Sequence, residues 1–128
     1  MPADVPIAAP AGGVLRLLRL EGAALAAAAL IAYGHLGVSW WLFVLLVMAP
    51  DLSFAAYLAG RRAGAFVYNL VHTTIVPVLF GALAYAAGET PLVAVSLIWL
   101  FHIGIDRMLG YGLKYASGFT DTHLGRIG

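Results

Sequence analysis

Four long apolar stretches, separated by short turns, dominate the sequence and restrict what it can fold into. They cover about residues 17–36, 39–59, 63–87 and 92–113. Each is close to the roughly 20 residues that an α-helix needs to cross the hydrocarbon core of a bilayer. Hydrophobic residues make up 62% of the chain and charged residues only 10%, which is far from the balance of a water-soluble domain. The sequence therefore predicts an all-α, integral membrane four-helix bundle over residues 14–113.

The two ends of the chain differ from these stretches. Residues 1–13 are rich in Pro, Ala and Gly and show no helical period, so we expect a flexible N-terminal arm. Residues 114–128 are polar and punctuated by glycine, and we expect a tail outside the bilayer. With four spans, both ends and the turn at 60–62 share one side.

Basic residues indicate which side that is. The turns near 34–38 and 88–91 have no Lys or Arg. All seven basic residues lie on the side of the two ends: Arg16, Arg19, Arg61, Arg62, Arg107, Lys114 and Arg126. Because cytoplasmic loops carry the excess of Lys and Arg, we expect both termini in the cytoplasm and the chain in the bacterial cytoplasmic (inner) membrane.

Two local patterns predict how the helices pack and bend. The first stretch is rich in alanine, which leaves a smooth surface on which a neighbouring helix can approach closely. Pro50 interrupts the second stretch directly before its one carboxylate, Asp51. Proline removes a backbone donor, so we expect this helix to bend there.

Ionisable residues within the apolar stretches point to a buried site. At 1.5 Å per residue, Asp51, His72, His102 and Asp106 each lie roughly 10 to 18 Å from the basic end of their helix. Three helices thus bring two histidines and two carboxylates to one layer of the cytoplasmic half of the bilayer. These are ligands for a hard or borderline divalent metal, and ionisable groups in a membrane often mark function.

Other polar residues extend this layer. His123 in the tail is a weaker candidate ligand, if the tail folds back beneath the bundle. We expect the remaining polar side chains to form a hydrogen-bonded network between helices: Tyr68, Asn69, Thr73, Arg107 and Asp121. The same four His and Asp side chains can also serve only as interhelical hydrogen-bonding groups, and the sequence leaves both interpretations open.

Composition excludes several classes of function. The chain has no cysteine, so disulfides, thiolate metal sites and cysteine nucleophiles are excluded. A net charge of +1 gives no indication of a nucleic-acid partner. The lipid bilayer is the one partner that the composition requires.

Several segments together resemble a known family. APDLSFAAYLAG, YNLVHT, WLFHIGIDRMLGYGLKY and DTHLGRIG are similar to those of the bacterial domain of unknown function 4260 family of short four-span membrane proteins. The resemblance covers nearly the whole chain after residue 13. It implies a four-helix membrane fold and no established activity.

Two hypotheses of different class follow. In the first, Asp51, His72, His102 and Asp106 hold a divalent metal that activates water for hydrolysis of a lipid-type substrate; Arg107, with Lys114, binds an anionic head group. In the second, the protein is a non-catalytic subunit of a larger membrane complex or a homo-oligomer. A variant of the second uses one histidine as axial ligand to a tetrapyrrole pigment or haem.

Overall fold

The computed structural model describes residues 9–126, and its secondary structure is almost entirely helical. The predicted arm therefore falls largely outside the described residues, and α1 already begins at Gly12. The helices are α1 (Gly12–Leu36), α2 (Trp40–Leu46), the 3-10 helix η1 (Ala49–Ala59), α3 (Arg61–His72), α4 (Ile75–Ala86) and α5 (Thr90–Leu109). Two short strands, β1 (Asp121–Thr122) and β2 (Gly125–Arg126), pair antiparallel in the tail.

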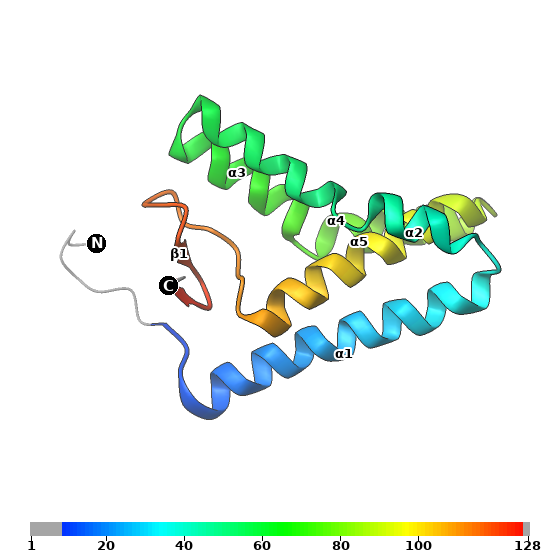
Figure 1. Cartoon of the computed structure of the whole chain (residues 1–128), viewed down its shortest axis with the longest axis horizontal. Coiled ribbons are helices and arrows are strands. Elements are labelled where there is room, and N and C mark those ends of the chain that lie inside the picture. Colours follow the sequence, from blue (N-terminus) through cyan, green and yellow to red (C-terminus); the bar gives the residue numbers. More distant parts are fainter. Residues whose placement is uncertain (1–8, 127–128) are drawn as a thin grey trace.

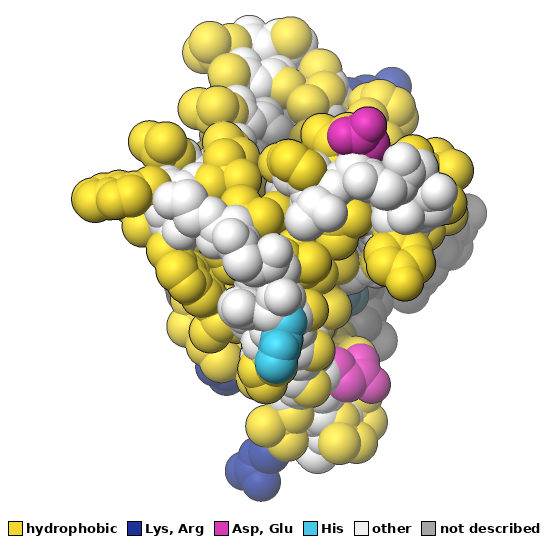
Figure 2. Space-filling view, turned by 90° about the vertical axis from the view of Figure 1, so that its right-hand side faces the viewer, with side chains coloured by type: hydrophobic (Ala, Val, Ile, Leu, Met, Phe, Trp, Pro, Cys, Tyr) yellow, Lys and Arg dark blue, Asp and Glu magenta, His cyan; other side chains and the backbone are white. Residues whose placement is uncertain are grey.

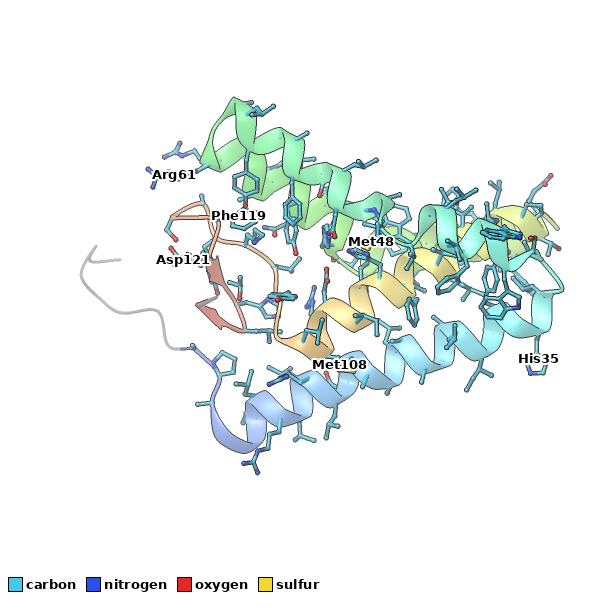
Figure 3. The ribbon with its side chains drawn as sticks, viewed as in Figure 1. His35, Met48, Arg61, Met108, Phe119 and Asp121 are labelled. Carbon is cyan, nitrogen blue, oxygen red and sulfur yellow. The ribbon has the colours of Figure 1, made fainter. Side chains whose placement is uncertain are left out.

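The helices run back and forth along one long axis (Figure 1). α1 packs along α5, η1 packs against α3, and α4 packs against α5. The start of α1, the turn between η1 and α3, and the tail all lie at one end of the molecule (Figure 1). His35 lies at the opposite end from Arg61 and Asp121 (Figure 3). This arrangement agrees with the predicted placement of both ends and the turn at 60–62 on one side.

Glycine lets the backbones of α1 and α5 touch where they cross. A Cβ built on Gly104 would lie 2.7 Å from the amide nitrogen of Ala26 and from the carbonyl oxygen of Gly22. A Cβ built on Gly22 would lie 2.8 Å from the carbonyl oxygen of Gly104. Real Cβ atoms do not approach that closely, so small residues are required here, as in other membrane helix crossings. The prediction that the alanine-rich first helix packs closely is confirmed.

The second predicted helix changes from α-helical to 3-10 geometry next to its proline. α2 ends at Leu46, and the chain continues from Ala49 as the tighter 3-10 helix η1, with Pro50 in its first turn. Because the amide of Asp51 bonds to the carbonyl of Met48, the carbonyl of Val47 lacks the helical donor that Asp51 would otherwise supply. The change to 3-10 hydrogen bonding thus frees a backbone acceptor beside the only carboxylate of this helix.

The third predicted helix, 63–87, is not continuous. It breaks after His72 into α3 and α4, which meet at a bend of 40°, and Thr73 has an extended backbone. In a continuous helix Pro77 would have to donate to the carbonyl of Thr73, which it cannot do because it has no N–H. In the observed fold Pro77 lies in the first turn of α4, where a missing donor costs nothing.

Within residues 9–126, two helices are long and apolar enough to cross a membrane, Trp40–Ala59 and Thr90–Leu109, and the bent pair of α3 and α4 makes a third if it counts as one span. α1 carries Arg16, Arg19 and Glu21 and does not belong to this set. Figure 2 shows a surface made mostly of hydrophobic side chains with few charges between them. The exposed face therefore has the chemistry of a surface in contact with lipid.

Candidate metal centre

The four predicted site residues come together in the structure from three separate segments. Asp51 lies on η1, His72 ends α3, and His102 and Asp106 lie one turn apart on α5. Nε2 of His102 lies 3.0 Å from Oδ1 of Asp51 and 3.3 Å from Oδ2 of Asp106. Nε2 of His72 lies 3.3 Å and 3.6 Å from the same two oxygens. We call Asp51, His72, His102 and Asp106 the His/Asp group.

Both histidines are oriented by a backbone carbonyl at their other ring nitrogen. Nδ1 of His72 donates to the carbonyl of Tyr68 at 2.9 Å, and Nδ1 of His102 donates to the carbonyl of Val47 at 2.6 Å. The Val47 carbonyl is the one that the turn into η1 leaves without a helical donor. A carbonyl only accepts, so Nδ1 carries the proton in each neutral ring and Nε2 presents a lone pair. Metal-ligating histidines are held in the same way.

The spacing of these atoms fits a single small cation. One nitrogen from each histidine and one oxygen from each aspartate all lie within 4.8 Å of one another. Ligands at metal bond lengths of about 2.0–2.2 Å in a tetrahedron lie roughly 3.4 Å apart. The four nitrogen–oxygen distances, 3.0 to 3.6 Å, bracket that value. The His/Asp group could therefore hold one divalent ion.

The group is closed on its histidine side and open on its carboxylate side. The side chains of His72 and His102 are 3% and 5% exposed, whereas those of Asp51 and Asp106 are 26% and 17% exposed. The two carboxylates line a cavity of about 270 Å³, whose other walls are Phe54, Tyr68, Tyr111, Lys114 and Phe119. We call this the polar cavity. The polar cavity therefore gives a further ligand or substrate access to the two carboxylates.

The aromatic residues of the polar cavity are stacked. The ring of Tyr68 lies on the imidazole of His72, with ring centres 3.8 Å apart and an interplanar angle of 11°. The ring of Phe54 stacks on Tyr68 at 5.4 Å. Phe119 of the tail packs on Phe54 and on Tyr57, and Figure 3 shows it beside the hairpin of η1 and α3. The tail therefore completes the cavity rather than hanging free in solvent.

Lys114 places an ammonium group in this aromatic setting. The residue is 5% exposed, and its Nζ donates to the carbonyl of Phe119 at 2.6 Å. Nζ also lies 3.6 Å from the centre of the Phe119 ring and 4.8 Å from that of Tyr68, so cation–π attraction contributes to holding it. Burial lowers the pKa of Lys114, and the charges of Asp106 and Asp51 act in the opposite direction.

Two side chains of α5 stabilise the break between α3 and α4. Nε1 of Trp99 donates to the carbonyl of Val71 at 2.6 Å, and Nη2 of Arg107 donates to the carbonyl of His72 at 3.0 Å. These carbonyls lose their helical donors at the break, and unpaired backbone groups are costly in a membrane. Arg107 thus makes hydrogen bonds within the predicted polar network. It does not line the polar cavity, whereas Lys114 does.

The other predicted network residues make local contacts. Asn69 bonds to the backbone of Lys114, Thr73 accepts a hydrogen bond from the amide of Ile75 at 3.4 Å, and Asp121 accepts one from Ser117. The tail does fold back, but His123 does not join the His/Asp group: its Nδ1 accepts from the amide of Leu113 at 2.8 Å, and its Nε2 lies 3.2 Å from Nη1 of Arg107. Burial and the nearby charge of Arg107 lower the pKa of His123.

Sequence reasoning missed the roles of Trp99 and of the helix break. Pro77 within the third apolar stretch signals that break, by the same logic that was applied to Pro50. An indole donor three residues before His102 on α5 is then the natural partner for a freed carbonyl. The contact between Asn69 and the tail has no comparable signal, because it joins residues 45 apart through a loop without periodicity.

Comparison with known proteins identifies a family. No curated protein and no solved structure matches the chain. A family model described as "Domain of unknown function (DUF4260)" matches residues 15–127, and the chain therefore belongs to this family.

Proposed function

We propose that this chain is a small multi-pass membrane protein in which Asp51, His72, His102 and Asp106 bind one divalent metal ion that activates water to hydrolyse a lipid-type substrate. The observation that carries the proposal is the orientation of the two imidazoles. Each donates Nδ1–H to a carbonyl, so both Nε2 lone pairs face two carboxylate oxygens. Four electron-rich atoms so close repel one another unless a cation lies among them.

A divalent ion satisfies this group with the right charge. Two neutral imidazoles and two carboxylates carry a charge of about −2, which one divalent ion cancels in a region where an unbalanced charge is costly. Two protons, one on each Nε2, would cancel the same charge and give a purely structural network. The metal content of the purified protein distinguishes a bound divalent ion from two Nε2 protons.

The proposed membrane topology follows from the layout of the helices. The helix pair α3 and α4 forms one broken span, α1 the fourth span beside the two apolar ones, and both termini lie in the cytoplasm. The basic residues support this orientation, since Arg61 lies at the end of the molecule where the first and last described residues are found (Figure 3) and donates a hydrogen bond to the carbonyl of Ser117 in the tail. The His/Asp group then lies in the cytoplasmic half of the bilayer, and the polar cavity opens toward the headgroup region.

The carboxylate side is where the chemistry takes place. A tetrahedral site with four protein ligands has no free position, so the bound water requires a fifth or sixth position, which suits manganese, iron or expanded zinc coordination. The polar cavity lies against the partly exposed carboxylates of Asp51 and Asp106, and the water enters from there. A divalent ion held by the His/Asp group would lower the pKa of a water bound to it, and the carboxylate oxygen of Asp51 or Asp106 that is not used as a ligand would accept the proton.

Of the two alternative functions, the tetrapyrrole ligand fits this geometry poorly and the non-catalytic subunit does not require it. An axial ligand to a tetrapyrrole needs an imidazole whose Nε2 faces an open apolar slot, whereas both Nε2 atoms face carboxylates here. A non-catalytic subunit of a larger complex needs no cation at all. The structure therefore favours the metal over the tetrapyrrole, and the experiment below separates it from the subunit.

Elemental analysis by inductively coupled plasma mass spectrometry tests the proposal on detergent-purified protein, with an absorption spectrum of the same sample. We expect close to one equivalent of a divalent metal in the native protein and a loss of at least tenfold in His102→Ala and in Asp106→Asn, because ligand removal costs several kcal/mol. His35→Ala and His123→Gln are the matched controls, since both remove a histidine outside the His/Asp group, and both should keep the metal.

Two outcomes would contradict the proposal. Native protein without metal, eluting as a folded species, would mean that protons balance the group and that the protein acts as a structural subunit. A visible absorption band lost in His72→Ala or His102→Ala would indicate a tetrapyrrole instead. Size-exclusion elution of each variant separates loss of metal from loss of fold.

A further inference from the structure

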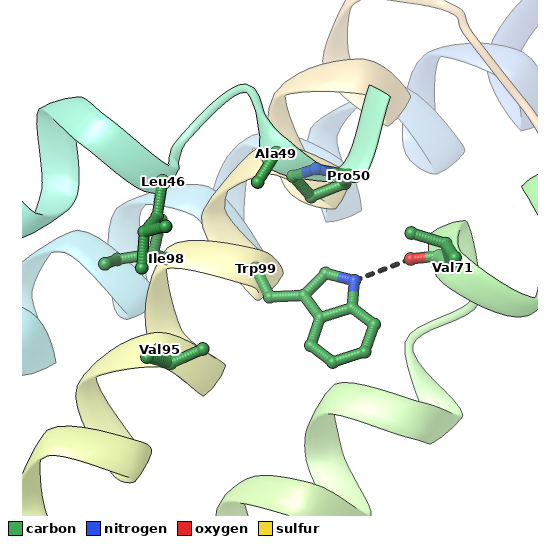
Figure 4. A pocket seen from close by; sticks show the side chains of 7 residues that line it. All are labelled: Leu46, Ala49, Pro50, Val71, Val95, Ile98 and Trp99. Carbon is green, nitrogen blue, oxygen red and sulfur yellow. Dashed lines mark hydrogen bonds between the residues drawn. The ribbon is translucent and has the colours of Figure 1, made fainter. Parts of the chain in front are cut away.

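Two cavities of opposite character flank the His/Asp group. The polar cavity lies on one side, with Lys114 and the two carboxylates in its wall. On the other side is an apolar cavity of about 260 Å³, lined by Leu46, Ala49, Pro50, Val71, Val95, Ile98 and Trp99. Figure 4 shows the indole of Trp99 among the residues that line this apolar cavity, with its hydrogen bond to the carbonyl of Val71.

The linings of the two cavities are adjacent along the chain on two elements. Pro50 lines the apolar cavity and the next residue, Asp51, lines the polar one. Val71 lines the apolar cavity, and the ring of the next residue, His72, belongs to the His/Asp group. A molecule that occupied both cavities would therefore lie beside the proposed metal.

The order of these sites along α5 matches the depth profile of a lipid. Ile98 and Trp99 line the apolar cavity, His102 and Asp106 follow one to two turns later, and Tyr111 and Lys114 line the polar cavity beyond the end of the helix. From Trp99 to Asp106 the helix rises about 10 Å. The apolar cavity thus lies toward the bilayer interior and the polar cavity toward the interface.

Lys114 is a cation that the His/Asp group does not neutralise. Its ammonium is held by the carbonyl of Phe119 and by aromatic rings, and neither Asp51 nor Asp106 lies within the 4 Å of an ion pair with it. Buried charges are normally paired. With a divalent ion balancing the carboxylates, Lys114 leaves the polar cavity positive and suited to an anion beside the metal.

We propose that these cavities bind an amphiphilic phosphate ester, with its phosphate between the metal and Lys114 and the start of its alkyl chain in the apolar cavity beside Trp99. The inference deepens the proposed function and rests on it, because the metal supplies one of the phosphate contacts. The other contacts come from Lys114 and Trp99, which are not metal ligands. Phosphate combines a negative charge with oxygens that both an ammonium and a metal ion bind.

Trp99 provides a direct reporter for the alkyl chain. The chain has three tryptophans, and Trp40 and Trp41 are exposed at 51% and 76%, so a full-length variant with Trp40→Phe and Trp41→Phe leaves Trp99 as the only indole. This protein is titrated in dodecyl maltoside with dodecyl phosphate, with dodecanol as the uncharged probe of equal tail length and inorganic phosphate as the probe without a tail. Trp99 emission and the unfolding temperature are followed.

We expect a saturable change in Trp99 emission with dodecyl phosphate, and binding at least tenfold weaker for dodecanol and for inorganic phosphate. Lys114→Met should weaken dodecyl phosphate at least tenfold, as loss of a charge-assisted hydrogen bond does, while Lys114→Arg restores part of the affinity. Arg62→Gln, which removes an exposed basic residue at the same end, is the matched control and should change nothing.

The possible failures are distinguishable. Equal binding of dodecanol, equal binding of inorganic phosphate, or unchanged affinity in Lys114→Met would each overturn this inference.

Metal analysis of the same samples reports on the proposed function separately. Stoichiometric metal without selective dodecyl phosphate binding would leave the metal site and remove its substrate class. Selective binding without metal would keep the lipid site and remove the hydrolysis. Metal retained by Lys114→Met shows that this variant is folded.

Discussion

Asn69 and Lys114 are joined by two hydrogen bonds of 2.7 Å each. Nδ2 of Asn69 donates to the carbonyl of Lys114, and the amide of Lys114 donates to Oδ1 of Asn69. The amide side chain thus pairs with the backbone of the tail as a neighbouring strand would. Through this pairing α3 fixes the position of Lys114, and with it one wall of the polar cavity.

Replacing Asn69 should release the tail. Asn69→Ala leaves the amide and carbonyl of Lys114 unpaired, which costs about 1–3 kcal/mol for a buried group. Limited digestion with trypsin should then cut after Lys114 at least tenfold faster than in the native protein, because that bond becomes accessible. Thr73→Val, which removes only a long hydrogen bond at 3.4 Å, is the control. Equal digestion rates for Asn69→Ala and the native protein would show that other contacts hold the tail.

The crossing of α1 and α5 should not tolerate a side chain at Gly104. Gly104→Ala puts a methyl group 2.7 Å from the backbone of α1, so the helices have to separate, at a cost of about 1–3 kcal/mol. The unfolding temperature in detergent should fall by several degrees. Gly34→Ala is the matched control within α1, since its nearest neighbour lies 3.7 Å away. A Gly104→Ala protein as stable as Gly34→Ala would contradict the close crossing.

The hydrogen bond from Trp99 to Val71 should contribute to stability beyond the size of the ring. Trp99→Phe keeps an aromatic side chain but leaves the Val71 carbonyl at the helix break without its donor, and we expect a loss of about 1–3 kcal/mol. Denaturant unfolding followed by circular dichroism measures this. Trp41→Phe, at a residue 76% exposed, controls for the substitution itself and should be near neutral. Similar losses in both variants would remove the proposed role of the indole.

The sequence predicted the His/Asp group better than its surroundings, and the reason is geometric. Asp51, His72, His102 and Asp106 lie on helices with a known rise and a common basic end, so their depths are calculable from the sequence. Asn69 and Lys114 meet through a loop, whose path depends on packing rather than on a period. Phe119, which lines the polar cavity, follows Lys114 in the same tail, so its position could not be calculated from the sequence either. The break at Thr73 could have been predicted from the sequence, because Pro77 has no N–H to continue a helix from α3.

His123 should make the stability of the protein depend on pH. Burial and the charge of Arg107 lower its pKa in the folded state below the ordinary value of 6.5, so the unfolded chain binds a proton first as the pH falls. Stability from this residue is therefore complete above about pH 6.5 and is lost as the pH drops below it. The informative quantity is the difference between the native protein and His123→Gln, because the comparison removes every pH effect that the two proteins share and leaves that of His123. Unfolding temperatures measured from about pH 7.5 to about pH 5 should fall more steeply for the native protein. Parallel profiles would mean that His123 gains its proton equally in both states, and that the tail is already displaced from Arg107 before the protein unfolds.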